Sequence, residues 1–209
     1  MATSTGQRVG IWIIAIVMAL GTIGSFFAII LQNDNAKVDQ ELSLEQQEKY
    51  QKLLDEYQKK VDAQTNELST QYYPVLSQFT GEVQPFNKDD VKEVATRELK
   101  EGDGEVIGDD TNYSAYYIGW NPDGKIFDQS IDGEKLIKPL PGTGLIEGWI
   151  EGVKGMKIGG VREITIPSDK AYGETGSGDL IPPHTPLKFI VLAIPTPETI
   201  PAPDFSELQ

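Results

Sequence analysis

The sequence predicts an α+β domain over residues 88–195, in which an antiparallel β-sheet packs on one short helix. Short segments of β-branched and aromatic residues recur there, and turn-forming residues such as Asn121-Pro122-Asp123-Gly124 separate them. One brief segment among them, 146–153, has a helical pattern. Short strands with a single helix are typical of the α+β class.

The composition excludes several kinds of site. The 209 residues carry a formal net charge of −14, and the clustered Lys and Arg of a nucleic-acid-binding surface are missing. The chain has no cysteine, which excludes disulfides, thiolate zinc sites and cysteine nucleophiles. Its single histidine, His184, argues against a histidine-rich metal site and a Ser-His-Asp triad. We therefore expect no metal, no cofactor and no nucleic-acid partner.

Residues 1–9 form a short polar segment, and residues 10–32 contain no charged side chain. A helix over 10–32 would be about 34 Å long, enough to cross a hydrocarbon core of about 30 Å. A cleaved signal peptide is the alternative, but its apolar core usually runs only about 7–15 residues. Arg8 precedes the stretch, which favours a cytoplasmic N-terminus. We therefore expect a single-pass anchor in the cell membrane, with the rest of the chain on the extracytoplasmic side.

Residues 33–80 are polar and charged and predict a helical stalk. A seam of residues at alternating steps of four and three runs along it: Tyr50, Leu54, Tyr57, Val61, Gln64 and Leu68. The helix is expected over residues 44–72 and should end at Pro74. Two interpretations stay open: the seam pairs with a second copy in a homodimer, or a single helix holds the domain away from the membrane. Residues 81–87 are expected to form a linker into the domain.

Within the domain, aromatic and alternating patterns predict the strands in turn. The predicted strands cover residues 91–99, 112–120, 125–130, 161–167 and 187–194. The stretch 131–144 is rich in Pro and Gly and is expected to be irregular. Residues 196–209 are Pro-rich and acidic, so we expect an extended or disordered tail there.

The stretch from Gly144 to Phe189 places apolar and aromatic residues at turns and loop edges, where a core alone would not need them. No nucleophile, acid–base pair or metal-ligand cluster accompanies them. This pattern indicates an apolar binding concavity.

Three sequence blocks occur in order along the domain: YYIGWNPDGKIFDQS over 116–130, LIEGWIEGVKGMKIGG over 145–160 and KAYGETGSGDLIPPHTPLKF over 170–189. Together they closely resemble the FKBP family of peptidyl-prolyl cis-trans isomerases, which bind macrolide immunosuppressants. The resemblance covers residues 88–195. It implies a twisted antiparallel sheet wrapped around one short α-helix, with the site between the sheet and the helix.

The resemblance also implies roles for individual residues. Trp149 would form the floor of the pocket, and Asp128 would supply the one carboxylate at its rim. The implied catalytic set is Tyr117, Phe127, Asp128, Trp149, Tyr172 and Phe189. The implied substrate-binding set is Leu136, Leu145, Ile146, Leu180 and Ile181.

The sequence also departs from the family pattern. Leu136 stands where many members carry an aromatic wall residue, and Gly144 stands where an acidic residue often contacts the drug. The connection that follows Asp128 is about one residue shorter than in compact members. Without the motifs, Trp149 and Phe189 would be interpreted as core residues and Asp128 as a turn cap.

Rotation about an X–Pro bond needs no nucleophile, because the obstacle is amide resonance, with a barrier of about 18–20 kcal/mol. A twisted amide is less polar than a planar one, so an apolar, water-poor pocket favours it. The sequence therefore predicts a membrane-tethered isomerase that acts on polypeptides, assists the folding of exported proteins and has a macrolide as a further ligand. The alternative is a non-catalytic module that binds proline-containing peptides or acts as a chaperone.

Overall fold

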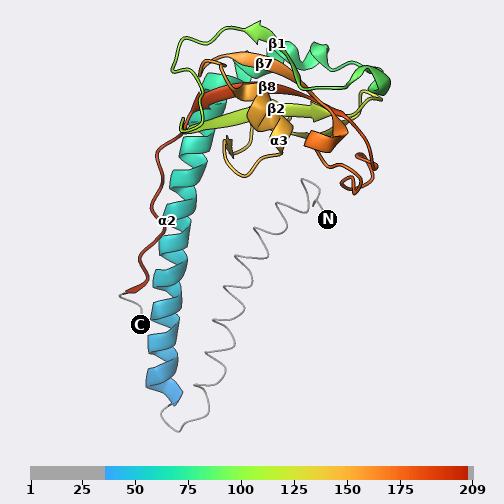
Figure 1. Ribbon diagram of the computed structural model, residues 1–209. Helices are drawn as coiled ribbons and strands as arrows, with labels where there is room; N and C mark the ends of the chain where they lie inside the picture. Colours follow the sequence, from blue (N-terminus) through green and yellow to red (C-terminus); the bar gives the residue numbers. More distant parts are fainter. Residues whose placement is uncertain (1–35, 207–209) are drawn as a thin grey trace. The chain divides into compact units, whose positions relative to one another are not determined.

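The computed structural model describes residues 36–206 (Figure 1). The chain divides into two units, which are described separately: one covers Thr65–Glu198, and the other contains residues 36–64 and 199–206. The N-terminal segment 1–9 and the predicted anchor 10–32 lie outside the described residues. Among residues 36–206, no helix is long and apolar enough to cross a membrane.

The first unit is built on a six-stranded antiparallel sheet. Five strands follow the order β1-β7-β8-β2-β3, and the sixth strand, β6, pairs with β2. The strands are β1 (Ala95–Lys100), β2 (Tyr113–Trp120), β3 (Ile126–Gln129), β6 (Leu140–Pro141), β7 (Val161–Ile166) and β8 (Leu187–Pro195). Strands β2 and β8 pair along the whole of β2, from Tyr113 opposite Pro195 to Trp120 opposite Lys188. Two short 3-10 turns, η2 (Lys88–Asp90) and η3 (Ser168–Lys170), lie in the connections.

The short helix α3 (Glu147–Val153) covers one face of this sheet. Two glycines bring it close to β7, because a Cβ on Gly148 would lie 2.2 Å from Ile166 and one on Gly152 would lie 2.3 Å from Ile164. The buried residues between α3 and the sheet form what we call the inner cluster, which includes Tyr117, Trp149, Val153, Ile164, Ile166, Ile181 and Phe189. The predicted antiparallel sheet on one short helix is confirmed.

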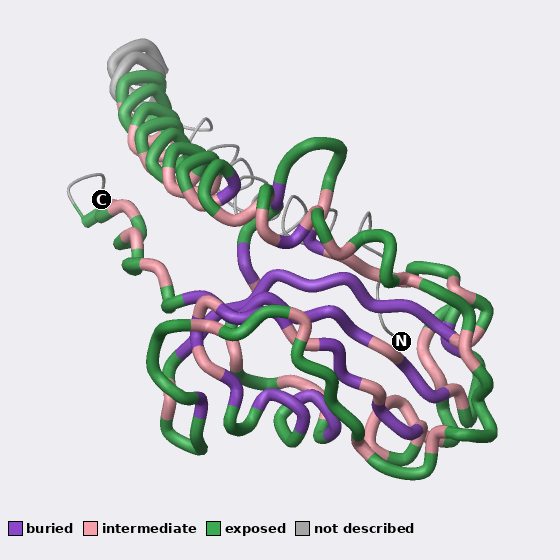
Figure 2. Tube along the Cα trace, turned by 90° about the horizontal axis from the view of Figure 1, so that it is seen from above, coloured by how far each residue is buried: buried purple, intermediate pink, exposed green. Residues whose placement is uncertain are grey.

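The other face of the sheet is covered by the end of α2 (Ala36–Leu76) and by the 3-10 helix η1 (Ser77–Glu82). The buried residues there form the outer cluster, which consists of Leu76, Tyr116, Ile118, Trp120, Leu136, Val161, Ile190, Leu192 and Ile194. Side chains alternate along β2, so Tyr116 and Trp120 enter the outer cluster while Ala115 and Tyr117 enter the inner one. As a result, β2 is buried along its whole length (Figure 2).

Helix α2 runs past Pro74, where it was expected to end. A proline inside a helix removes one N–H and crowds the preceding turn. Two residues later, however, Leu76 is fully buried in the outer cluster, and Tyr72 packs against the same cluster. Burial of these side chains against the sheet stabilises the last turn of the helix in spite of Pro74.

The predicted linker, residues 81–87, also packs on the sheet. Its Val83 and Phe86 side chains lie against the outer cluster. The Trp120 indole Nε1–H donates a hydrogen bond of 2.9 Å to the carbonyl oxygen of Gln84. These contacts hold the segment along the outer face of the sheet.

The stretch 131–144, expected to be irregular, contains regular structure. Strands β4 (Ile131–Asp132) and β5 (Lys135–Leu136) form a separate two-stranded hairpin, and β6 follows it. Each of these strands is only two residues long, which leaves no alternation for a sequence pattern to reveal.

The second unit contains the first part of the described α2 and the C-terminal tail. The rings of Tyr50 and Phe205 stack with their centroids 4.4 Å apart. The tail predicted as extended or disordered therefore contacts the seam of the stalk helix. Pairing of the seam with a second copy stays a prediction.

Candidate active site

Four aromatic rings from four elements meet on the α3 side of the sheet: Tyr117 of β2, Phe127 of β3, Trp149 of α3 and Phe189 of β8. The Trp149 ring centroid lies 5.1 Å from that of Phe189 and 5.5 Å from that of Tyr117. The Phe127 and Phe189 centroids are 5.6 Å apart. These three pairs are edge to face, with interplanar angles of 72° to 85°, which is a favourable geometry for aromatic rings. We call this group the aromatic cluster.

The cluster depends on Gly119 in β2, which lies opposite Phe189 in the β2–β8 register. A Cβ at this position would lie 2.7 Å from the Phe189 ring and 2.8 Å from the Phe127 ring. A residue without a side chain is therefore needed for the two rings to meet. The sequence analysis did not single out Gly119, although a glycine inside an otherwise apolar strand is a signal of close approach.

The floor of the cluster is almost completely buried. Trp149 is only 2% exposed, and among the described residues neither its Nε1–H nor the Tyr113 hydroxyl has a hydrogen-bond partner. Burial raises the pKa of Tyr113. The Trp149 ring is thus an enclosed floor, packed edge to face against Tyr117 and Phe189.

One carboxylate borders the aromatic cluster. The Tyr117 hydroxyl donates a hydrogen bond of 2.6 Å to Asp128 Oδ2, and the Gln129 backbone N–H donates one of 3.0 Å to Asp128 Oδ1. Hydrogen bonds to a carboxylate are shorter and stronger than those between neutral groups. Asp128 therefore fixes the direction of the Tyr117 hydroxyl.

Most of the other predicted site residues belong to the inner cluster or pack against it, and this cluster contains Tyr117, Trp149 and Phe189. Ile181 is buried in the inner cluster, and three partly buried side chains pack against it: Leu145, Ile146 and Tyr172. Leu180 is among the exposed large apolar residues. Its carbonyl oxygen accepts a 2.9 Å hydrogen bond from Asn121 Nδ2, which ties this loop to the turn after β2.

The structure does not bring Leu136 to the aromatic cluster. Its side chain is 3% exposed and lies in the outer cluster, across the sheet from Trp149. The next residue, Ile137, is 38% exposed. Side chains alternate along an extended chain, so Leu136 and Ile137 point to opposite sides.

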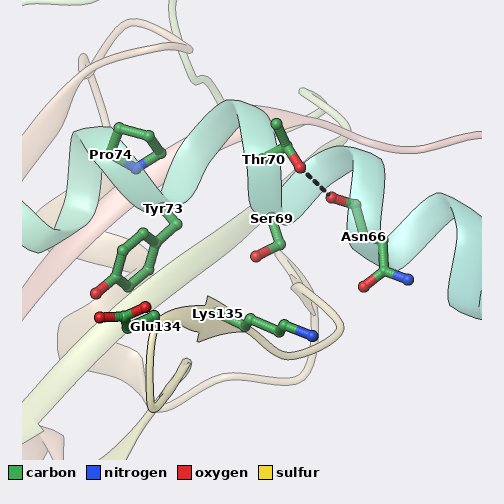
Figure 3. Close-up of a pocket in the computed structure, with 7 residues that line it drawn as sticks. All are labelled: Asn66, Ser69, Thr70, Tyr73, Pro74, Glu134 and Lys135. Carbon is green, nitrogen blue, oxygen red and sulfur yellow. Dashed lines mark hydrogen bonds between the residues drawn. The ribbon is translucent and has the colours of Figure 1, made fainter.

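A hollow of about 230 Å³ lies elsewhere in the first unit, between the end of α2 and the β4–β5 hairpin (Figure 3). It is lined by Asn66, Ser69, Thr70, Tyr73, Pro74, Glu134 and Lys135. No residue of the aromatic cluster borders it. Among the described residues, no group of three or more His, Cys, Asp or Glu side chains could hold a metal ion.

The geometry defines what the aromatic cluster can do. It offers an apolar floor, apolar walls and one carboxylate that is engaged by a tyrosine hydroxyl. Tyr117, Trp149 and Phe189 are at most 7% exposed, so an apolar group that contacts this cluster would be shielded from water. A reaction without nucleophilic attack or proton transfer suits this arrangement.

Comparison with known proteins identifies the family. A family model described as FKBP-type peptidyl-prolyl cis-trans isomerase matches residues 102–193. The FK506-binding protein of Neisseria meningitidis serogroup A is 42% identical over 95 residues, which cover 45% of this chain and 87% of that protein. The probable FKBP-type 25 kDa peptidyl-prolyl cis-trans isomerase of Pseudomonas aeruginosa is 41% identical over 96 residues, which cover 46% of this chain and 40% of that protein.

A crystal structure of the peptidyl-prolyl cis-trans isomerase from Pseudomonas syringae pv. tomato is 35% identical with a TM-score of 0.43, and the match covers 56% of this chain and 87% of that chain. The family match includes β2, β3, α3, β7 and most of β8, the elements that carry the aromatic cluster. A 42%-identical relative matched over 87% of its length shows that the chain belongs to the FKBP-type peptidyl-prolyl cis-trans isomerase family and is an enzyme of that type.

Proposed function

We propose that the X–Pro bond of the substrate rotates in the aromatic cluster, with the proline ring on Trp149 between Tyr117, Phe127 and Phe189. The observation that carries this proposal is the convergence of four rings from four elements around one apolar floor. A proline ring is small and apolar, and burial stabilises it by about 25 cal/mol for each Å² removed from water.

Catalysis then follows from a difference in polarity. The planar amide is stabilised by resonance and by water, and the uncatalysed bond takes about 10–100 s to rotate. The twisted amide has lost that resonance and is less polar. A pocket that excludes water therefore stabilises the transition state more than the ground state, which is the condition for acceleration.

Asp128 acts by orientation in this proposal. Its carboxylate holds the Tyr117 hydroxyl, so the Tyr117 ring forms a fixed wall against Trp149. No proton passes between Asp128 and the substrate. Leu145, Ile146, Tyr172, Leu180 and Ile181 contact the residues on either side of the proline, and a macrolide of the FK506 type occupies the same cluster.

The test compares two phenylalanines that are both partly buried on this sheet. Phe127→Ala removes a wall of the aromatic cluster, whereas Phe86→Ala removes a ring that packs against the outer cluster. Full burial of a Phe side chain is worth about 1.5–3 kcal/mol, and Phe127 is partly buried, so kcat/KM of Phe127→Ala should fall about tenfold. Cis-to-trans relaxation of an X–Pro peptide measures it. Equal losses in both variants, corrected for the folded fraction, would place the site elsewhere.

We also propose that residues 10–32 anchor the enzyme in the cell membrane and that the isomerase acts outside the cytoplasm on exported polypeptides. The uncharged run over 10–32 and the polar residues that follow it support this proposal. In intact cells that express the full chain, added protease should release the isomerase domain. Survival of the domain in intact cells, together with its digestion after lysis, would put it in the cytoplasm.

A further inference from the structure

A hydrogen bond joins α2 to the β4–β5 hairpin. The Leu136 backbone N–H donates to Ser69 Oγ at 2.8 Å, and the Ser69 side chain is almost completely buried. A hydroxyl inside a helix commonly bonds a carbonyl of its own preceding turn, as that of Thr70 does to Asn66. Ser69 instead points across to β5 (Figure 3).

A hollow lies beside this hydrogen bond, so few side-chain contacts share its role of holding the hairpin against α2. Glu134 and Lys135 line one side of the hollow, and Thr70 and Tyr73 line the other (Figure 3). Side chains therefore do not fill the space between the hairpin turn and the helix. The Ser69 hydroxyl holds β5 at the edge of this space, where Leu136 enters the outer cluster.

From β5, further hydrogen bonds lead to the aromatic cluster. The Ile137 N–H donates to the Ser130 carbonyl at 2.9 Å. Ser130 is 1% exposed and makes two bonds with the Tyr117 backbone: its N–H donates to the Tyr117 carbonyl at 2.8 Å, and its Oγ accepts from the Tyr117 N–H at 3.0 Å. These bonds connect β5, through Ser130, to the backbone of Tyr117, a residue of the aromatic cluster.

We propose that Ser69 is a positioning residue for substrate binding, acting on Tyr117 through the β4–β5 hairpin and Ser130. Ser69 contacts neither the substrate nor a ring of the cluster. Its loss lets the hairpin shift and loosens the wall that Tyr117 forms. A looser wall binds the substrate less tightly in the ground state and in the transition state, by the same amount. KM therefore rises, and kcat changes little.

The test uses the full chain and two neighbouring hydroxyls. Ser69→Ala removes the acceptor of the Leu136 N–H, and the matched control Thr70→Ala removes an exposed hydroxyl that lines the same hollow. We expect Ser69→Ala to raise KM for an X–Pro peptide about three- to tenfold, the effect of losing one hydrogen bond, with kcat within about twofold. Thr70→Ala should leave both constants unchanged.

Amide hydrogen exchange supplies a second measurement on the same variants. In Ser69→Ala, the Leu136 amide should exchange at least about tenfold faster, and protection of the Tyr117 amide should also fall. Ser69→Cys replaces the hydroxyl with a somewhat larger thiol, which is a weaker acceptor, so KM should rise there too, even if Ser69→Ala does not fold. An unchanged KM in a folded Ser69 variant, or an equal rise in Thr70→Ala, would overturn the proposal.

Discussion

Gly119→Ala is the substitution that most sharply tests how the aromatic cluster is built. The added methyl would lie 2.7 Å from the Phe189 ring and 2.8 Å from the Phe127 ring, whereas carbon atoms pack at about 3.5–4.0 Å. Each of the two rings must therefore move away from the added methyl by about 1 Å. Phe127 is partly exposed and can move, whereas Phe189 is held between β2 and β7.

The energetic and catalytic effects of this change can be separated. Overpacking of a core costs about 1–3 kcal/mol, which urea unfolding followed by circular dichroism will measure. Misplacing a binding group by about 1 Å can cost about 100-fold in rate, so we expect kcat/KM to fall about 10- to 100-fold in the folded enzyme. The loss of activity should exceed the loss of folded protein.

Gly81→Ala is the matched control, because nothing lies within 4 Å of a Cβ there and its φ is not positive. It should keep wild-type activity. If Gly119→Ala kept wild-type kcat/KM, or lost activity only in proportion to its unfolded fraction, the reasoning that ties the ring contacts to catalysis would be refuted.

Three further predictions follow from single groups. Asp128→Asn keeps an acceptor for the Tyr117 hydroxyl, so kcat/KM should fall less than about tenfold; a loss beyond about 1000-fold would instead indicate acid–base catalysis. Tyr116→Phe removes a buried hydroxyl that has no partner among the described residues, so urea unfolding should show unchanged or higher stability. Burial also raises the pKa of Tyr116, so above about pH 10 this phenol ionises in the unfolded chain before it does so in the folded protein. Ionisation of the unfolded chain lowers the free energy of unfolding, and Tyr116→Phe should therefore lose less stability above that pH than the wild type. Gly152→Ala would place a methyl 2.3 Å from Ile164 and push α3 off β7, so it should lower both the urea midpoint and kcat/KM, and an unaltered midpoint would contradict the packing.

Much of the sheet could be predicted because its strands are long enough to show a pattern. The aromatic run over 112–120 became β2, and the apolar run over 187–194 became β8. The predicted helix over 146–153 became α3 because its glycines and apolar residues repeat at helical spacing. These three segments carry Tyr117, Trp149 and Phe189, which only the family resemblance assigned to the pocket.

The cover of the outer face could not be predicted in the same way. Tyr116 and Trp120 alternate with Tyr117 on β2, and both sets are apolar, which indicates a strand buried on both faces. The sequence analysis nevertheless assigned only one helix to the sheet. The stalk helix showed polar residues and a proline at its end, and only tertiary contacts made by Leu76 reveal that it packs there.

The position of Leu136 shows a second limit. A shift of one residue in a connection moves a side chain to the opposite side of the chain, and family spacing alone does not specify where that shift is absorbed. In the structure Leu136 pairs with Ile131 in the β4–β5 hairpin, and its side chain joins the outer cluster. Gly119 illustrates the complementary case, because its importance comes from two rings on β3 and β8, the strands that flank β2.

The assignment of the active site is tested most directly by locating the proline ring of a bound substrate. Nuclear Overhauser effects between the proline ring protons of an X–Pro peptide and the full chain can be recorded under conditions in which the enzyme turns the peptide over. The aromatic cluster predicts contacts to the rings of Trp149, Tyr117 and Phe189, with loss of these contacts in Gly119→Ala. Contacts confined to the hollow beside Tyr73, with none to Trp149, would contradict the assignment of the active site.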